Sequence, residues 1–183
     1  MMIDNDVSRS RKNEILAAAR DLLEREGRAA LTLRRLAEAL GIRAPSLYKH
    51  YGSKEELEAA LGAAGFEELG TALAGLRDLT GLAQAYRAYA LGHPHLYRLM
   101  TEARAAEGAE SRSAEPILAA VGDPDRARAV WAFAHGMVDL ELAGRLPAGA
   151  GLDTAWAAGI GAFAGSPTAL PRRSAVFTSF RVD

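Results

Sequence analysis

The fold is decided by residues 31–57, which read "LTLRRLAEALGIRAPSLYKHYGSKEEL" and contain two short helices and the start of a longer one. Thr32 suits an N-cap, because its hydroxyl can accept a hydrogen bond from a free backbone N–H of the first turn. The apolar residues that follow lie on one stripe, which predicts a helix over 32–40. Gly41 ends that helix in the manner of a left-handed cap.

The second short helix is predicted over 44–50, with Pro45 in its first turn, where the missing N–H does no harm. It gives only Leu47 and the following Tyr51 to a core, while tyrosine, lysine and histidine face outward. A helix this short is not stable by itself. We therefore expect its neighbours to hold it, so that its other face is free to contact a partner.

A longer helix precedes this stretch, over 9–26, and Gly27 is its natural end. The helices over 9–26, 32–40 and 44–50 together form a helix-turn-helix unit. In such a unit the second helix of the pair, the recognition helix, enters the major groove of duplex DNA, and the other helices hold it and contact phosphates. The pattern predicts a DNA-binding head over residues 9–52.

The residues expected to contact DNA lie on the recognition helix and at two other helix starts. They are Thr32, Arg43, Ala44, Pro45, Ser46, Tyr48, Lys49, His50 and Lys54. The four residues that begin the recognition helix can approach base edges, and the three polar residues after Leu47 can donate to phosphate oxygens. Thr32 and Lys54 begin their helices, where free N–H groups and the positive end of the dipole suit a phosphate. For Ser46, Tyr48 and Lys49 the alternative is a solvated surface.

The charge distribution agrees with a nucleic-acid-binding head. Residues 1–55 hold eleven Lys and Arg against eight Asp and Glu, whereas residues 56–183 hold eleven against fifteen. A basic N-terminal third on an acidic remainder fits a small DNA-binding unit carried by a different module.

The rest of the chain predicts an all-α body over 53–165. Ser53 and Glu56 form a capping box that begins its first helix. Helices are expected over 53–76, 80–92, 94–107, 113–121, 124–145 and 153–164. The tail over 166–183 changes composition, and we expect it to lie outside the packed domain.

The composition is that of a soluble globular protein, with 49% hydrophobic and 25% charged residues among 183. The absence of cysteine excludes disulfides, thiolate metal sites and a cysteine nucleophile. No apolar run approaches the ~20 residues that span a bilayer, and the N-terminus lacks the apolar core of a signal peptide. We expect a cytoplasmic protein that contacts no membrane.

The stretch over 31–57 resembles the DNA-binding head of TetR-type transcriptional repressors. The matching residues are Gly41, Leu47, Tyr48, Tyr51, Lys54 and Leu57. The resemblance covers about residues 10–57, and it implies a homodimeric repressor whose C-terminal body binds a small effector and releases operator DNA. One residue departs from the pattern, because the recognition helix often begins with Ser or Thr in this family and here begins with Arg43. Arginine cannot cap the helix, but it can read a guanine through two hydrogen bonds.

A second resemblance lies in the body. The stretch "WAFAHGMVDLELAGRL", residues 131–146, is similar to a C-terminal domain named for a Trp-His-Gly signature, here Trp131, His135 and Gly136. The preceding "GHPHLYRLM", residues 92–100, is similar to the same subgroup. The resemblance does not identify the ligand.

The effector pocket is predicted between the helices of 80–107 and 113–145. Its expected lining is Tyr86, Tyr89, Tyr97, Met100, His135 and Asp139. Aromatic side chains with polar tips suit a mostly apolar cavity with a few convergent polar groups. The alternative is that these side chains fill the core and that the tyrosine hydroxyls bond to the backbone.

Dimerisation is predicted to use the last two helices, 124–145 and 153–164. One stripe of the final helix holds Trp156, Ile160 and Phe163, and a second face holds Ala155, Ala158, Gly159 and Ala162. Two such faces on one helix indicate contacts on two sides, one of them with a partner subunit.

Other classes of function find less support. His93, His95 and His135 could be metal ligands, with Asp139 or Glu141 as a fourth, but no known ligand spacing is present, so we predict no metal and no cofactor. No nucleophile elbow, phosphate loop or paired acidic motif is present, and we predict no catalytic residue and no enzyme. The main alternative is an effector-independent DNA-binding or architectural protein, whose body would be filled.

Overall fold

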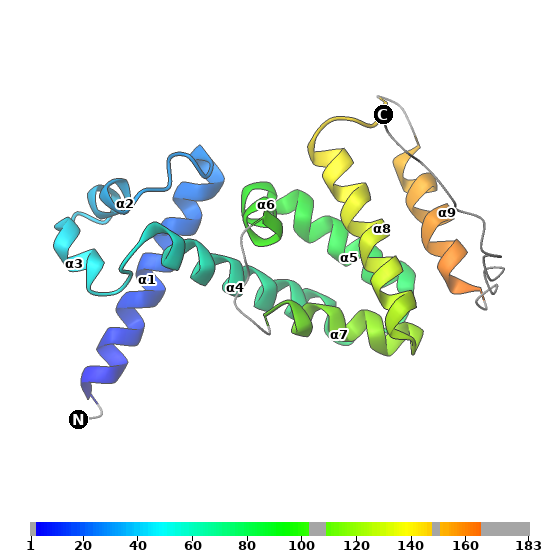
Figure 1. The fold of residues 1–183 in the computed structure, drawn as a ribbon, viewed down its shortest axis with the longest axis horizontal. Helices are drawn as coiled ribbons and strands as arrows, with labels where there is room; N and C mark the ends of the chain where they lie inside the picture. Colours follow the sequence, from blue (N-terminus) through cyan, green and yellow to red (C-terminus); the bar gives the residue numbers. More distant parts are fainter. Residues whose placement is uncertain (1–2, 103–108, 148–150, 166–183) are drawn as a thin grey trace, which may run out of the picture.

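The computed structural model describes residues 3–102, 109–147 and 151–165, and every regular element within these ranges is a helix (Figure 1). The elements are α1 (Ile3–Glu26), α2 (Leu33–Ala39), α3 (Ala44–Tyr48), α4 (Lys54–Leu73), α5 (Leu79–Gly92), α6 (Pro94–Glu102), α7 (Ala109–Val121), α8 (Pro124–Leu142) and α9 (Leu152–Ala164). The all-α prediction is confirmed. The tail over 166–183 lies outside the described residues.

The helices form two groups joined by α4. Helices α1, α2 and α3 lie at one end of the molecule, α8 and α9 lie at the other, and α4 runs from the first group into the second (Figure 1). We call α1–α3 the head and α4–α9 the body. Within the body α4 packs against α5, α6 and α7, and α5 packs against α8 and α9.

The head is built as the sequence predicts. Leu47 is fully buried and Tyr51 is 4% exposed, so the short recognition helix α3 is anchored by these two side chains. The Thr32 hydroxyl accepts a hydrogen bond from Arg35 N–H at 3.2 Å and caps α2. Gly41 adopts a φ of +64°, a conformation that favours glycine, and its left-handed cap is confirmed.

The capping box at the start of α4 differs in one detail from the usual pattern. The Ser53 hydroxyl accepts from Glu56 N–H at 3.2 Å, as expected. The Glu56 carboxylate, however, accepts from Gly52 N–H at 2.7 Å rather than from Ser53. The box therefore fixes the residue before the cap as well, and it ties the turn after α3 to the start of α4.

Two glycines allow helices to approach closely. A Cβ on Gly65 of α4 would lie 2.5 Å from the sulfur of Met100 on α6. A Cβ on Gly159 of α9 would lie 2.0 Å from the ring of Phe133 on α8. Gly159 was predicted to belong to a small-residue face that meets a partner subunit. The structure corrects this, because the close neighbour of Gly159 is Phe133 of the same chain.

Several helix bounds differ from those predicted. Helix α1 begins at Ile3 rather than at 9. Helix α8 ends at Leu142 rather than at 145, because Gly144 has a φ of +63°. Helix α4 ends at Leu73, and residues 103–107 of the helix predicted over 94–107 lie outside the described residues.

Candidate functional site

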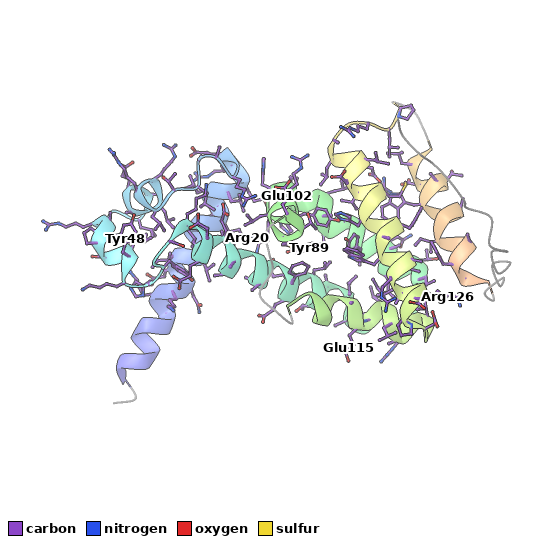
Figure 2. All side chains as sticks on the ribbon, in the orientation of Figure 1. Arg20, Tyr48, Tyr89, Glu102, Glu115 and Arg126 are labelled. Atoms are coloured by element: carbon purple, nitrogen blue, oxygen red, sulfur yellow. The ribbon has the colours of Figure 1, made fainter. Side chains whose placement is uncertain are left out.

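The recognition helix presents a polar face away from the body. Arg43 is the N-cap residue of α3, and its side chain makes no capping hydrogen bond. Among the predicted DNA-binding residues, Arg43, Pro45, Ser46, Tyr48 and Lys49 are exposed, whereas Ala44 and His50 are half-buried. Tyr48 lies at the outer end of the head and is 55% exposed (Figure 2). An exposed aromatic residue held by a buried Leu47 suits contact with a partner surface.

The two residues predicted at helix starts differ from each other. Thr32 is exposed, and its hydroxyl is used as a cap. Lys54 is half-buried, and its ammonium group donates to the backbone carbonyl of Arg28 at 3.0 Å and lies 3.7 Å from the Glu58 carboxylate. The phosphate contact expected of Lys54 therefore stays a prediction. To reach a phosphate, this side chain must leave an intramolecular site.

Among the exposed cations of the head that were not predicted as DNA contacts, Arg34 lies beside Thr32. Arg34 is the second residue of α2, and its side chain is 87% exposed. Its guanidinium donates to Glu38 at 3.1 Å, an exposed pair that contributes little to stability. The available signal was a basic residue in the first turn of α2, two positions after Thr32.

The body contains a hydrogen-bonded aromatic cluster that joins three helices. The hydroxyl groups of Tyr86 and Tyr97 lie 2.8 Å apart, and the Tyr97 hydroxyl lies 2.7 Å from Nδ1 of His135. The Trp131 ring stacks on His135, with centroids 5.4 Å apart and planes within 6°. We call Tyr86, Tyr97, Trp131 and His135 the aromatic cluster. It links α5, α6 and α8, and three of its members, Tyr86, Tyr97 and His135, were predicted to line the pocket.

Burial sets the protonation of the two tyrosines. Desolvation raises the pKa of Tyr86. Desolvation also raises the pKa of Tyr97, as do the neighbouring Tyr86 and the negative charge of Asp139. Both hydroxyls therefore stay neutral and act as hydrogen-bonding groups. Trp131 differs from its neighbours because 47% of its surface is exposed.

The remaining predicted pocket residues do not join this cluster. The Tyr89 hydroxyl donates to the carbonyl of Gly65 at 3.0 Å, and Met100 is buried against the same glycine. Asp139 is exposed. The structure thus brings together Tyr86, Tyr97 and His135, packs Tyr89 and Met100 against α4, and leaves Asp139 at the surface.

Charged side chains of α1 connect the head to the body. Arg20 pairs with Glu68 of α4, and Arg28, just after α1, pairs with Glu58 of α4. Between them, the Glu24 carboxylate accepts hydrogen bonds from backbone N–H groups at the start of α6. These contacts were not predicted, because the partners lie at least 30 residues apart in sequence.

The three histidines considered as metal ligands have separate neighbours. His135 bonds to Tyr97, His93 lies against the Tyr89 ring at 5.0 Å, and His95 lies 3.6 Å from where a Cβ on Gly27 would be. Within the described ranges no group of three His, Asp or Glu side chains could hold a metal ion. Of the helices described, none is sufficiently long and apolar to cross a membrane.

Comparison with known families assigns both parts of the chain. Residues 15–61 match the family described as "Bacterial regulatory proteins, tetR family". Residues 79–163 match the one described as "Tetracyclin repressor-like, C-terminal domain". The second match does not confirm the Trp-His-Gly type of C-terminal domain.

Similar proteins agree with this assignment. An uncharacterized HTH-type transcriptional regulator of Mycobacterium tuberculosis is 32% identical over 154 residues, which cover 73% of this chain and 71% of that protein. A solved structure of a protein of unknown function from Rhodococcus sp. RHA1 superposes with a TM-score of 0.71 and 28% identity, covering 83% of this chain and 92% of that one. A TetR variant from Acinetobacter baumannii in complex with minocycline superposes with a TM-score of 0.62 and 28% identity, covering 81% and 91%. The chain therefore belongs to the TetR family, and it is a DNA-binding transcriptional regulator.

Proposed function

We propose that this regulator is a homodimeric repressor that a small-molecule effector releases from operator DNA. The observation that carries the proposal is the link from α3 to the aromatic cluster. The exposed recognition helix belongs to a head whose α1 bonds to α6, and Tyr97 of α6 bonds to His135 of α8. A ligand that displaces the cluster can therefore change the position of the head and its affinity for DNA. By linkage, DNA binding changes the affinity for the ligand by the same factor.

The DNA contacts divide by role. Arg43 and Ser46 are exposed at the start of α3, where a helix N-terminus approaches base edges. Tyr48, Lys49 and the half-buried His50 follow, and their polar atoms suit phosphate oxygens. Arg34 on α2 adds an exposed cation beside Thr32. Arg43 is expected to determine the preference for particular bases. Lys49 is expected to contact a phosphate and to strengthen binding to all sequences alike.

The dimer interface is proposed on the outer faces of α8 and α9. Ala129 and Ala132 of α8 are exposed, and no atom lies within 4 Å of where a Cβ on Gly136 would be. On α9 the exposed small residues are Ala155, Ala158 and Ala162. Small residues on two neighbouring helices allow a second copy to pack closely and complete a four-helix arrangement about a two-fold axis.

The effector site is proposed at the aromatic cluster. The half-exposed Trp131 offers a stacking surface, and His135 and Tyr97 offer polar atoms beside it. Two nearby guanidinium groups have intramolecular partners, since Arg98 donates to the Leu142 carbonyl and Arg87 pairs with Glu141. An aromatic or neutral polar effector suits this arrangement better than an anion. The minocycline complex of the A. baumannii relative supports a small-molecule ligand. The residues Trp131, His135 and Gly136 support the Trp-His-Gly subgroup.

One observation favours the alternative of an effector-independent DNA-binding protein. The buried side-chain oxygen and nitrogen atoms of the described residues all have hydrogen-bond partners, so the aromatic cluster needs no ligand to satisfy it. In that case Tyr86 and Tyr97 are core residues, and the contacts between α6 and the head fix one geometry.

The two candidates are separated by one sequence of experiments. Operator duplexes are selected from a random library with the full-length protein at fixed salt, and a library of small aromatic and polar compounds is then screened by thermal shift. Compounds that stabilise the protein are tested for release of the selected duplex, with His135→Ala and Tyr89→Trp as variants. Release that His135→Ala weakens supports the proposal. Selection of a duplex that no stabilising compound releases would favour the alternative.

A further inference from the structure

The N-terminus of α6 is held by a side chain of the head. The backbone N–H of His95 donates to the Glu24 carboxylate at 3.3 Å, and that of Leu96 donates to it at 2.9 Å. These are the first donors of α6, because Pro94 has no N–H. A helix is usually capped by the residue just before it, whereas this acceptor lies 71 and 72 residues earlier in the chain. The start of α6 is therefore completed by α1.

The rest of α6 contacts the aromatic cluster and α8. The Tyr97 hydroxyl bonds to Tyr86 and His135, and Arg98 donates to the Leu142 carbonyl at 2.8 Å. At nine residues, α6 has little room between these contacts and Glu24. A displacement of Tyr97 should therefore also move the N–H groups of His95 and Leu96, which lie within one turn of it and donate to Glu24.

Arg20 and Glu24 lie one turn apart on α1, Arg28 follows the end of this helix, and the three side chains have different partners. Arg20 and Arg28 pair with Glu68 and Glu58, both on α4, the helix that continues from the head. Glu24 alone of the three contacts the backbone of α6. Figure 2 shows Arg20 and Glu102 in the region where the head meets the body.

A second polar contact joins α6 to the head, but it is weaker. Glu102 accepts from Arg28 at 3.3 Å, and the two side chains are 60% and 44% exposed. An exposed pair of this kind is readily replaced by water. Glu24 has two acceptor bonds at the positive end of a helix, where a carboxylate is favoured. It is the stronger link.

We propose that Glu24 is the positioning residue that couples the aromatic cluster to the head. This inference rests on the proposed function, because it names the side chain through which α6 and the DNA-binding helices move together. When α6 shifts, Glu24 either carries α1 with it or loses its two hydrogen bonds. Without Glu24, α6 and the head respond to their own ligands independently.

Hydrogen exchange of the full-length protein, with and without a selected operator duplex, tests this role. In the wild type, duplex binding should slow exchange of the α6 amides over 97–101 by about fivefold or more, the size of a typical coupling. Glu24→Ala should remove most of this difference, and Glu24→Gln, which keeps an acceptor but loses the charge, should reduce it in part. Glu26→Ala is the matched control, because Glu26 pairs with Arg35 inside the head. It should keep the full difference.

The outcomes separate coupling from simple capping. A cap with no coupling role would make α6 exchange faster in Glu24→Ala by the same factor with and without the duplex, and the duplex-induced difference would stay at its wild-type size. That result overturns the proposal. If Glu24→Ala does not fold, Glu24→Gln decides, and an undiminished difference in that variant has the same meaning. Failure to select any duplex with the wild type would instead overturn the proposed function, and the inference with it.

Discussion

Arg28 holds the Glu58 carboxylate through two parallel hydrogen bonds, with Nε 2.9 Å from Oε1 and Nη2 2.8 Å from Oε2. Glu58 is 5% exposed and is the buried charged residue of the described core. Glu58 lies on α4 of the body, whereas its partner Arg28 belongs to the head. The relative position of head and body therefore depends on an ion pair whose acidic member is shielded from water.

This pair predicts a specific loss of stability in acid. The hydrogen bonds from Arg28 hold the pKa of Glu58 below its ordinary 4.5, and they outweigh the opposing effect of burial. A carboxyl group with a lowered folded-state pKa contributes stability that is complete above the unfolded pKa and is lost as pH falls through the folded one. Urea unfolding at about pH 7 and pH 3 should show a smaller pH dependence for Glu58→Gln than for the wild type. Glu38→Gln, which removes an exposed pair with Arg34, serves as control and should keep the wild-type pH dependence.

Arg43 should determine the base preference. Its side chain is exposed at the start of α3 and makes no capping bond, so it is free to reach a base edge. Arg43→Ala should relax the preference at one operator position, at a cost of about 1–3 kcal/mol against the best base. Lys49→Ala should weaken binding to all duplexes alike. Binding measured against a set of single-base operator variants distinguishes these effects, and equal losses for both variants would contradict the assignment.

Lys54 should contribute one phosphate contact despite its intramolecular partners. The distance of 3.7 Å to Glu58 is long for an ion pair, and Glu58 keeps both Arg28 bonds when the lysine leaves. Lys54→Ala should weaken binding to every duplex and reduce the log–log salt slope by about one unit. Titrations at several salt concentrations measure the slope. An unchanged slope with a lowered melting temperature would assign Lys54 to the junction alone.

Gly159 should not tolerate a side chain while Phe133 is present. The Phe133 ring lies between Trp156 and Phe163, with centroids 5.7 Å and 5.9 Å away, so it has little freedom to move from a new methyl group. Gly159→Ala should destabilise the protein by about 1–3 kcal/mol through overpacking. In a Phe133→Ala background the same change should be neutral or stabilising, because alanine favours a helix by about 1 kcal/mol over glycine. A double-mutant cycle from thermal unfolding checks this, and equal costs in both backgrounds would exclude the contact as the cause.

The outer face of α9 should hold the dimer together. Ala158 is exposed among other small residues, and a glutamate there would place a charge within a closely packed interface. Ala158→Glu should shift sedimentation at micromolar protein from dimer to monomer. Ala88→Glu, at an exposed position of α5, is the matched substitution and should leave the dimer intact. A wild type that sediments as a monomer would remove this part of the proposal.

Local signals in the sequence account for most of the head. Leu47, Tyr51 and Gly41 could be assigned because their roles depend on neighbours within a few residues, through helical spacing and left-handed turn geometry. The contact of Lys54 with the Arg28 carbonyl and those of Glu24 with α6 could not be found in this way, because they depend on how α1 and the residues after it pack against α4 and α6. The aromatic residues show the same limit. Their types and spacing place Tyr97 and His135 on facing helices. Only the packed structure shows that these two side chains bond to each other while Tyr89 bonds to the backbone of α4.

The cap that α1 supplies to α6 limits how freely the parts of this protein can be exchanged. A hybrid that joins this body to the head of another regulator would leave the N–H groups of His95 and Leu96 without their acceptor, unless the new α1 carries a carboxylate or amide at the position of Glu24. A nine-residue helix without that acceptor is poorly stable alone. Grafts that keep the boundary at Ser53 but neglect position 24 should therefore bind DNA yet lose their response to ligands, even though every residue of both modules is retained.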